Sequence, residues 1–230
     1  MKHANEKVSN EWKKTFLELL LYSRVLQFGE FKTKSGRTTP YFFNTGNFSS
    51  GRTIGSVAAC YAQLISKEFG GKVTNLFGPA YKGIPLCVAA SQSLAALLDR
   101  DIGFTFNRKE QKDHGEGGSL IGASYSEPHQ VVVIEDVLTG GTSLRETMHL
   151  MRGFPVKVIG CAIGVDRQER GLGEKRAAIE IEKEFNVPVR AILTLDEIVD
   201  LLFEREVLGK IWVNADAKKR IDAYRAEYGA

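Results

Sequence analysis

The chain has 230 residues, of which 43% are hydrophobic and 26% charged, so it can bury one sizeable core and is predicted to form a single domain over residues 1–230. Its formal net charge of +3 arises from 31 basic and 28 acidic residues spread along the chain, which argues against a basic arm for nucleic acid. No apolar run approaches the roughly 20 residues that span a bilayer, so no membrane partner is expected. The polar N-terminus and the lack of such a run predict a cytoplasmic protein. The three cysteines lie far apart among apolar neighbours, which predicts buried reduced thiols: Cys60, Cys87 and Cys161.

The N-terminal part contains a helical pattern followed by a hairpin pattern. Apolar residues at helical spacing predict a helix over residues 11–27, with Gly29 where its cap would lie. Two strand-like runs in FKTKSGRTTPYFFN are joined through Ser35 and Gly36, which predicts a hairpin outside the main pattern. We expect this hairpin to belong to a small hood or lid over about residues 28–48.

Helical and strand patterns take turns along the rest of the chain. Helices are predicted over about 53–69, 83–97, 142–152 and 174–185, and strands over 73–77, 102–106, 130–135, 156–164 and 188–194. Two more helical patterns follow in LDEIVDLLFER and DAKKRIDAYRAEY. This alternation predicts an α/β fold with a mainly parallel twisted sheet flanked by helices. Ligands of such sheets bind outside the carboxyl ends of the strands, which directs attention to FGPAYKG, FNRKEQKDHGEGG and IEDVLTGGTS.

The segment IEDVLTGGTS ends a buried run with Glu135 and Asp136 and continues into a loop of small residues and hydroxyls. Two neighbouring carboxylates that lose hydration need hydroxyls, a cation or a metal as partners. The loop over residues 139–143 can direct backbone N–H groups and hydroxyls at an anion where a helix begins. Carboxylates that can bind the two hydroxyls of a sugar, beside a loop that can bind the phosphate of the same sugar, indicate a ribose 5-phosphate site. The alternative is a capped helix after a strand, with both carboxylates merely exposed.

The other two junctions carry cations and glycines. In NRKEQKDHGEGG, acidic residues nearly cancel the charges of Arg108, Lys109, Lys112 and His114, and the glycines suit a loop that closes over a ligand. A solvated surface loop is the alternative. In GPAYKG, Lys82 can meet diphosphate charge, although a common turn before a helix would have the same sequence features. The chain contains neither the P-loop motif nor the dinucleotide-binding glycine motif in these loops.

IEDVLTGGTS resembles the phosphoribosyl-diphosphate motif of the type I phosphoribosyltransferases. Together with FGEFKTKSGRTTPYFFN, LFGPAYKGIP, FNRKEQKDHGEGG and DRQERG in this order, it resembles the orotate phosphoribosyltransferase family from about Phe28 to Gly171. The resemblance implies the transfer of ribose 5-phosphate from phosphoribosyl diphosphate to N1 of orotate, which forms orotidine 5′-monophosphate and diphosphate. It also implies Mg²⁺, held mainly by substrate, and a homodimer with shared active sites.

The resemblance also assigns individual residues. Glu135 and Asp136 would hold the ribose hydroxyls, directly or through magnesium, and the 5′-phosphate would lie against Val137, Leu138, Thr139, Gly140, Gly141, Thr142 and Ser143. Diphosphate would meet Lys34, Tyr81, Lys82, Arg108, Lys109, Lys112 and His114, with Lys109 serving the neighbouring subunit and a cis peptide between Ala80 and Tyr81. Orotate would contact Phe42, Phe43, Thr139 and Arg167. The expected catalytic residues are Arg108, Lys112, His114 and Asp136.

Two positions depart from the family pattern, because many relatives have an aspartate in place of Glu135 and an alanine in place of Gly140. Since Glu keeps the charge, we expect a small change in ribose or metal geometry without loss of activity. Two other functions fit the sugar-phosphate loop. A transferase for another base would leave Arg167, Phe42 and Phe43 without a purpose, and a regulator that senses phosphoribosyl diphosphate would bind without turnover.

Overall fold

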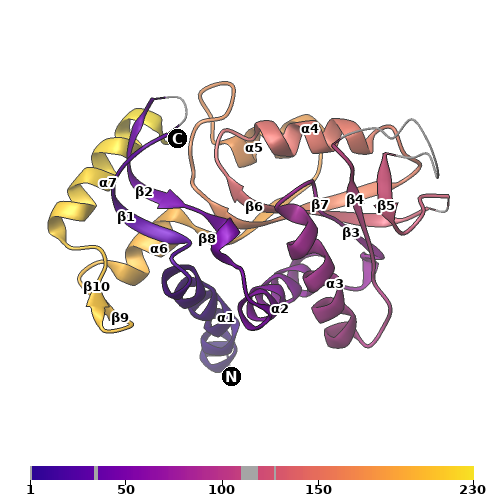
Figure 1. The fold of residues 1–230 in the computed structure, drawn as a ribbon, viewed down its shortest axis with the longest axis horizontal. Helices are drawn as coiled ribbons and strands as arrows, with labels where there is room; N and C mark the ends of the chain where they lie inside the picture. Colours follow the sequence, from indigo (N-terminus) through magenta and orange to yellow (C-terminus); the bar gives the residue numbers. More distant parts are fainter. Residues whose placement is uncertain (1, 34–35, 110–118, 127) are drawn as a thin grey trace.

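The computed structural model describes residues 2–33, 36–109, 119–126 and 128–230. Its centre is a six-stranded twisted sheet with the strand order β5-β4-β3-β6-β7-β8 (Figure 1). β5 runs antiparallel to β4, and the other neighbouring strands are parallel. The strands are β3 Asn75–Phe77, β4 Gly103–Asn107, β5 Leu120–Gly122, β6 Gln130–Leu138, β7 Lys157–Asp166 and β8 Val189–Thr194. The predicted α/β fold with a mainly parallel sheet is confirmed.

Helices cover both faces of the sheet (Figure 1). On one face lie α1 Lys2–Tyr22, α2 Gly51–Glu68 and α3 Gly83–Leu98, and on the other α4 Thr142–Met151 and α5 Ala177–Phe185. Alternate residues of β6 enter the two cores: Val132 and Ile134 pack on the α1–α3 side, and Val131 and Val133 on the α4–α5 side. A strand buried on both faces needs apolar side chains at every position, which explains the run VVVI.

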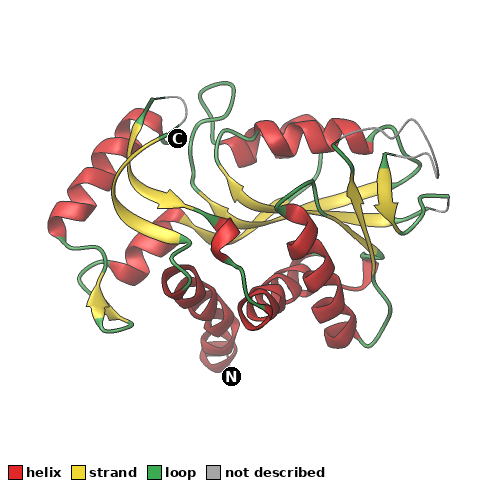
Figure 2. Ribbon diagram, viewed as in Figure 1, coloured by secondary structure: helices red, strands yellow, loops and turns green. Residues whose placement is uncertain are grey.

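A second structural group lies beside the β8 end of the sheet (Figure 2). It contains an antiparallel hairpin and the C-terminal elements: β1 Leu26–Lys32, β2 Thr38–Phe43, α6 Leu195–Leu202, β9 Glu206–Val207, β10 Lys210–Ile211 and α7 Ala215–Tyr228. Short 3₁₀ turns, η1 Thr45–Asn47 and η2 Gly70–Lys72, connect elements elsewhere. α7 packs against β2, so the end of the chain contacts the predicted hood.

Several predicted boundaries were wrong. The first helix ends at Tyr22 rather than residue 27, because Arg24 adopts a positive φ of 53° and the chain then enters β1, where Gly29 is a strand residue and not a cap. β6 continues to Leu138 because Val137 and Leu138 still pair with β7, so the two carboxylates lie inside the strand. The three short strands β5, β9 and β10 were not predicted, since runs of two or three residues show no periodicity.

The three cysteines are buried and free, as predicted. Among the helices of the described ranges, none combines the length and the apolar character that a bilayer crossing requires. The assignment of residues 1–230 to a single domain stays a prediction.

The packing between β7 and the end of α2 generates a stability test. A Cβ added at buried Gly160 would lie 2.1 Å from Cε1 of Phe69, whereas one added at exposed Gly55 on α2 would meet no atom within 4 Å. We expect Gly160→Ala to lower the free energy of unfolding by about 1–3 kcal/mol through overpacking, and Gly55→Ala to raise it by about 0.5–1 kcal/mol. Urea unfolding of both variants measures this, and equal effects would contradict the packing of Phe69 on β7.

Candidate active site

The two carboxylates near the end of β6 point to different partners. Glu135 is 8% exposed, and its Oε2 accepts a hydrogen bond from the Ser143 hydroxyl on α4 at 3.0 Å. Asp136 Oδ1 accepts from the backbone N–H of Val137 at 2.7 Å. Its Oδ2 accepts from the Thr45 hydroxyl and lies 3.6 Å from Lys82 Nζ. Because both carboxylates are at least partly buried and partnered, the alternative of two merely exposed side chains is wrong.

Burial and the neighbouring charge change the acidity of this pair. Burial, followed by the negative charge of Asp136, raises the pKa of Glu135 to about 8. The Ser143 hydroxyl acts in the opposite direction but does not offset the burial. A cation or further hydrogen-bond donors beside the pair would stabilise the ionised form of Glu135.

The loop after β6 forms a pocket of about 200 Å³ at the N-terminus of α4. Gly141 has a φ of +84°, and an added Cβ would lie 2.8 Å from Ile181 Cδ1, so this position requires glycine. Backbone groups and hydroxyls surround the pocket where the helix dipole favours an anion. The structure therefore brings together every residue predicted for the phosphate cradle: Val137, Leu138, Thr139, Gly140, Gly141, Thr142 and Ser143.

A buried arginine holds this cradle, and the sequence reasoning missed it. Arg145 is 7% exposed; its Nη1 donates to the carbonyl oxygen of Gly140 at 3.1 Å, and its Nη2 and Nε donate to Glu180 and Glu184 on α5, each at 2.8 Å. Glu180 also accepts backbone hydrogen bonds from Leu172 and Gly173. The spacing of four residues between the two glutamates was the available signal, because it puts both on one helix face.

The GPAYKG loop lies beside the carboxylates and contains the predicted cis peptide between Ala80 and Tyr81. The backbone N–H of Ala80 donates to Asn107 Oδ1 at 2.9 Å, which ties the loop to the end of β4. A Cβ on Gly78 would lie 2.3 Å from the carbonyl oxygen of Gly83, so the tight approach requires glycine. The Lys82 side chain is 57% exposed and extends toward Asp136.

The cationic loop is described only at its two ends. Lys109 Nζ lies 5.2 Å from the centroid of the Tyr81 ring of the same chain, which is a cation–π distance. Arg108 donates its backbone N–H to Ser119 at 2.8 Å, and its buried Nε has no hydrogen-bond partner in the part of the chain that the structure describes. Lys112 and His114 lie outside the described residues, as does Lys34 in the hairpin.

The residues predicted for orotate differ in exposure. Phe42 is 38% exposed and stacks on Phe31, with ring centroids 5.5 Å apart. Phe43 points the other way on β2, where its ring is 8% exposed and packs against Tyr41, so a ligand can reach it mainly through its backbone. Of this pair, only Phe42 presents an exposed ring.

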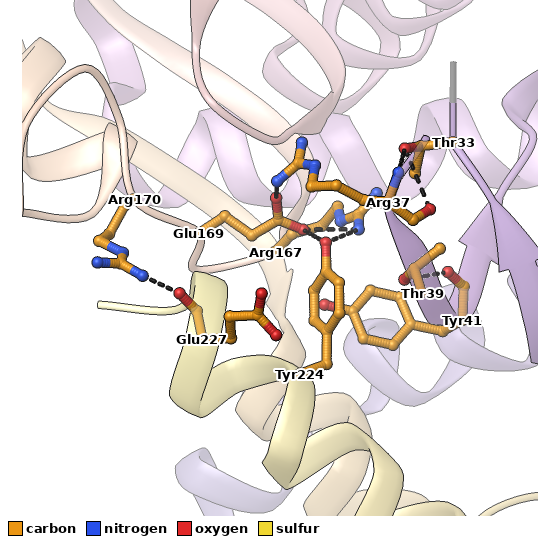
Figure 3. A network of polar contacts seen from close by, with 9 residues as sticks. All are labelled: Thr33, Arg37, Thr39, Tyr41, Arg167, Glu169, Arg170, Tyr224 and Glu227. Carbon is orange, nitrogen blue, oxygen red and sulfur yellow. Dashed lines mark hydrogen bonds and ion pairs between the residues drawn. The ribbon is translucent and has the colours of Figure 1, made fainter. Parts of the chain in front are cut away.

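Arg167 follows β7 and is connected to the cradle through the backbone, because its N–H donates to the carbonyl oxygen of Leu138 at 3.0 Å. Its side chain is buried between the hairpin and α7 (Figure 3). Nη2 lies 2.6 Å from Glu169 Oε1, while the buried Nε has no hydrogen-bond partner among the described residues. A guanidinium with an unused N–H can donate a hydrogen bond to the carboxylate of a ligand.

The raised pKa of Glu135 predicts a pH dependence of stability. Between the ordinary pKa near 4.5 and the folded value of about 8, the folded protein holds a proton that the unfolded chain has lost. Stability is therefore lost as the pH rises through this window. We expect Glu135→Gln to remove this loss and to be more stable than the wild-type protein by about 1–3 kcal/mol at pH 9. Urea unfolding at pH 5 and pH 9 measures the difference, and parallel pH profiles would contradict the burial of an acidic group here.

Comparison with known proteins gives a consistent result. Residues 46–191 match the phosphoribosyl transferase domain family. The chain is 43% identical over 220 residues to the orotate phosphoribosyltransferase of Clostridium acetobutylicum, which covers 95% of this chain and 98% of that protein. The crystal structure of the Francisella tularensis orotate phosphoribosyltransferase superposes with a TM-score of 0.78 at 36% identity, covering 94% of this chain and 99% of that one.

A more distant structure shares the fold alone. It is the Mycobacterium tuberculosis orotate phosphoribosyltransferase in complex with 5-phospho-alpha-D-ribosyl 1-diphosphate, with a TM-score of 0.61 and 21% identity over 81% of this chain and 98% of that one. Identity as high as that to the Clostridium protein, along nearly the whole of both chains, does not arise between unrelated families. The chain belongs to the orotate phosphoribosyltransferase family.

Proposed function

We propose that the family's reaction, the transfer of ribose 5-phosphate from phosphoribosyl diphosphate to N1 of orotate, takes place at the carboxyl ends of β3, β6 and β7. This assignment rests on the position of Arg167, the proposed orotate contact, next to the phosphate pocket. The backbone N–H of Arg167 donates to the carbonyl oxygen of Leu138, which lines that pocket. The alternatives of another base or a non-catalytic sensor are set aside, because the relatives with high identity are orotate phosphoribosyltransferases.

In this proposal the sugar phosphate occupies the pocket after β6. Backbone N–H groups and hydroxyls of residues 137–143 hold the 5′-phosphate, and Glu135 and Asp136 hold the ribose hydroxyls. The structure supports this placement of the phosphate next to the ribose. Glu135 lines the same pocket as the loop, and the Ser143 hydroxyl donates a hydrogen bond to Glu135. The relative from Mycobacterium tuberculosis, which shares this fold, binds the corresponding diphosphate sugar.

The diphosphate end of the substrate would lie over the GPAYKG loop. Breaking the anomeric C–O bond gives an oxocarbenium-like transition state, so the site must stabilise the departing diphosphate and the cationic sugar. The Asp136 carboxylate lies 3.6 Å from Lys82 at the edge of this loop, which is where the bond between sugar and diphosphate would break. We therefore assign Asp136 to the stabilisation of the cationic sugar. The proposed diphosphate contacts are Tyr81, Lys82, Arg108 and Lys109, with Lys34, Lys112 and His114 from the segments outside the described residues.

Orotate would bind between Arg167, Thr139 and the hairpin. Arg167 Nε, which has no hydrogen-bond partner in the described ranges, supports an anionic group there, and the exposed ring of Phe42 supports a flat one. Phe43 would contribute its backbone groups. The sequence predictions of a cytoplasmic location, of a single domain, and of no nucleic-acid or membrane partner stay predictions.

The residues present fit the Mg²⁺ that the family implies. Mg²⁺ prefers oxygen ligands. A cation beside the carboxylate pair would stabilise ionised Glu135 and so offset the burial and charge repulsion that raise its pKa. Within the described ranges, no group of three or more metal-ligating side chains occurs. We therefore propose that Glu135 and Asp136 would hold the ion through water and that substrate oxygens would supply its other ligands. When bound, the ion would neutralise diphosphate charge.

We also propose a homodimer in which Lys109 serves the neighbouring active site. Apolar side chains stay exposed on the GPAYKG loop, on α3 and on β5, where a second subunit could cover them. They are Tyr81 at 64%, Val88 at 38% and Ile121 at 37% exposure.

Asp136 provides the direct test of the sugar site. We expect Asp136→Asn to lower kcat/KM for phosphoribosyl diphosphate by about 10²–10³-fold, because a neutral amide cannot stabilise the cationic sugar. The loss of orotate absorbance in the ultraviolet, with phosphoribosyl diphosphate and Mg²⁺ present, measures the rate. Exposed Asp101→Asn is the matched control. A nearly unaffected Asp136→Asn enzyme would mean that the carboxylate pair is structural.

Mixing two impaired variants tests the shared site. Lys109→Ala and Asp136→Asn should each be poorly active alone. In a mixed dimer, one site would combine an intact Asp136 with the partner's intact Lys109. After refolding an equal mixture, activity should recover to about a quarter of the wild-type value, since half of the dimers are mixed and each has one complete site. No recovery, with mixed dimers shown by mass, would mean that each site uses its own Lys109.

A further inference from the structure

Arg167 is enclosed by residues from three separate parts of the chain (Figure 3). Its Cζ lies 4.9 Å from the centroid of the Tyr41 ring on β2, and its Nη2 lies 2.6 Å from Glu169 Oε1. The same Nη2 donates to the hydroxyl of Tyr224 on α7 at 3.3 Å. Its conformation is therefore set by groups that include one from the C-terminal helix, outside the matched domain of residues 46–191.

The Tyr224 hydroxyl makes two hydrogen bonds at once. It accepts from Arg167 and donates to Glu169 Oε1 at 3.0 Å, so the three groups form a closed triangle. The Tyr224 ring packs edge-on against Tyr41, with centroids 5.6 Å apart. Arginine, glutamate and tyrosine are each at most 9% exposed, which leaves little water to compete with these bonds.

α7 is attached to the segment that carries Arg167. The backbone N–H of Arg170 donates to the carbonyl oxygen of Tyr228 at 3.0 Å, and that of Ala230 donates to Gln168 at 3.2 Å. The Arg170 guanidinium also donates to the carbonyl oxygen of Glu227. These contacts attach the C-terminal end of α7 to residues 168–170, so the position of Tyr224 relative to Arg167 is fixed.

Glu169 lies between two arginine side chains. Glu169 Oε2 lies 3.6 Å from Arg37 Nη1, while its Oε1 meets Arg167. One carboxylate thus contacts two guanidinium groups, and within the described part of the chain Arg167 Nε has no hydrogen-bond partner. Because Glu169 contacts Nη2, the carboxylate of a ligand could bind through Nε without displacing Glu169.

We propose that Tyr224, together with Glu169, is a positioning residue that fixes the Arg167 guanidinium for the carboxylate of the base substrate. The inference rests on the proposed function, which assigns Arg167 to orotate. It makes α7 part of the base specificity of the enzyme. The hydroxyl acts through Arg167 and touches no reacting atom, so its loss affects orotate affinity more than the chemical step.

Tyr224→Phe tests this inference, because it removes the hydroxyl and keeps the ring that packs on Tyr41. We expect the KM for orotate to rise about fivefold, the effect of losing one hydrogen bond, with kcat and the KM for phosphoribosyl diphosphate nearly unchanged. Tyr228→Phe is the matched control on the same helix. Its ring lies 4.8 Å from the Tyr224 ring, between centroids, whereas its hydroxyl is hydrogen-bonded to the side chain of Glu227.

A double variant separates positioning from a general structural effect. In an Arg167→Met background, Tyr224→Phe should raise the orotate KM no further, because the group it orients is gone. Thermal unfolding of each variant reports whether the fold is intact.

The outcomes distinguish the two proposals. A wild-type protein that does not convert orotate would overturn the proposed function and this inference with it. If the wild-type protein is active, a Tyr224→Phe enzyme with unchanged orotate KM would overturn the inference alone. So would an equal rise in both KM values, or an additive effect in the Arg167→Met background.

Discussion

The arrangement of the site depends on a pair of carboxylates placed inside a buried strand. β6 is apolar on both faces from Val131 to Ile134, and the next two side chains would destabilise the fold if no donor met them. Three groups from separate parts of the chain reach the carboxylates, namely Thr45 on η1, Lys82 before α3 and Ser143 on α4. The Tyr61 hydroxyl on α2 donates to the backbone carbonyl oxygen of Glu135. The same contacts that satisfy the pair therefore bring the cradle and the diphosphate loop together.

The parts of the site that lie together in the sequence could be predicted from it. The carboxylates, the glycines and the hydroxyls of residues 135–143 are consecutive, so a local pattern of a buried run followed by small polar residues was enough. The alternation of helices and strands gave the sheet for the same reason. Short irregular pieces were missed: β5 has three residues, and the end of the first helix depends on the φ angle of Arg24.

The pairing of the groups that hold the site in place could not be predicted, because the partners are distant in sequence. Arg145 reaches Glu184, 39 residues away, Asn107 reaches Ala80, 27 residues away, and Tyr224 reaches Arg167, 57 residues away. Each of these side chains is unremarkable within its own helix or strand. Only the tertiary structure shows that buried polar groups select one another as partners.

The composition of the cradle has a consequence for ionic strength. Residues 137–143 contain no lysine or arginine, so the proposed phosphate contacts are backbone dipoles and hydroxyls in a partly enclosed pocket. Dissolved ions screen exposed charges strongly and such short-range, oriented dipoles weakly. The proposed diphosphate contacts instead include exposed cations such as Lys82. Salt should thus weaken the binding of the diphosphate group more than the binding of the 5′-phosphate. At high ionic strength the sugar donor would then be held mainly by its 5′-phosphate.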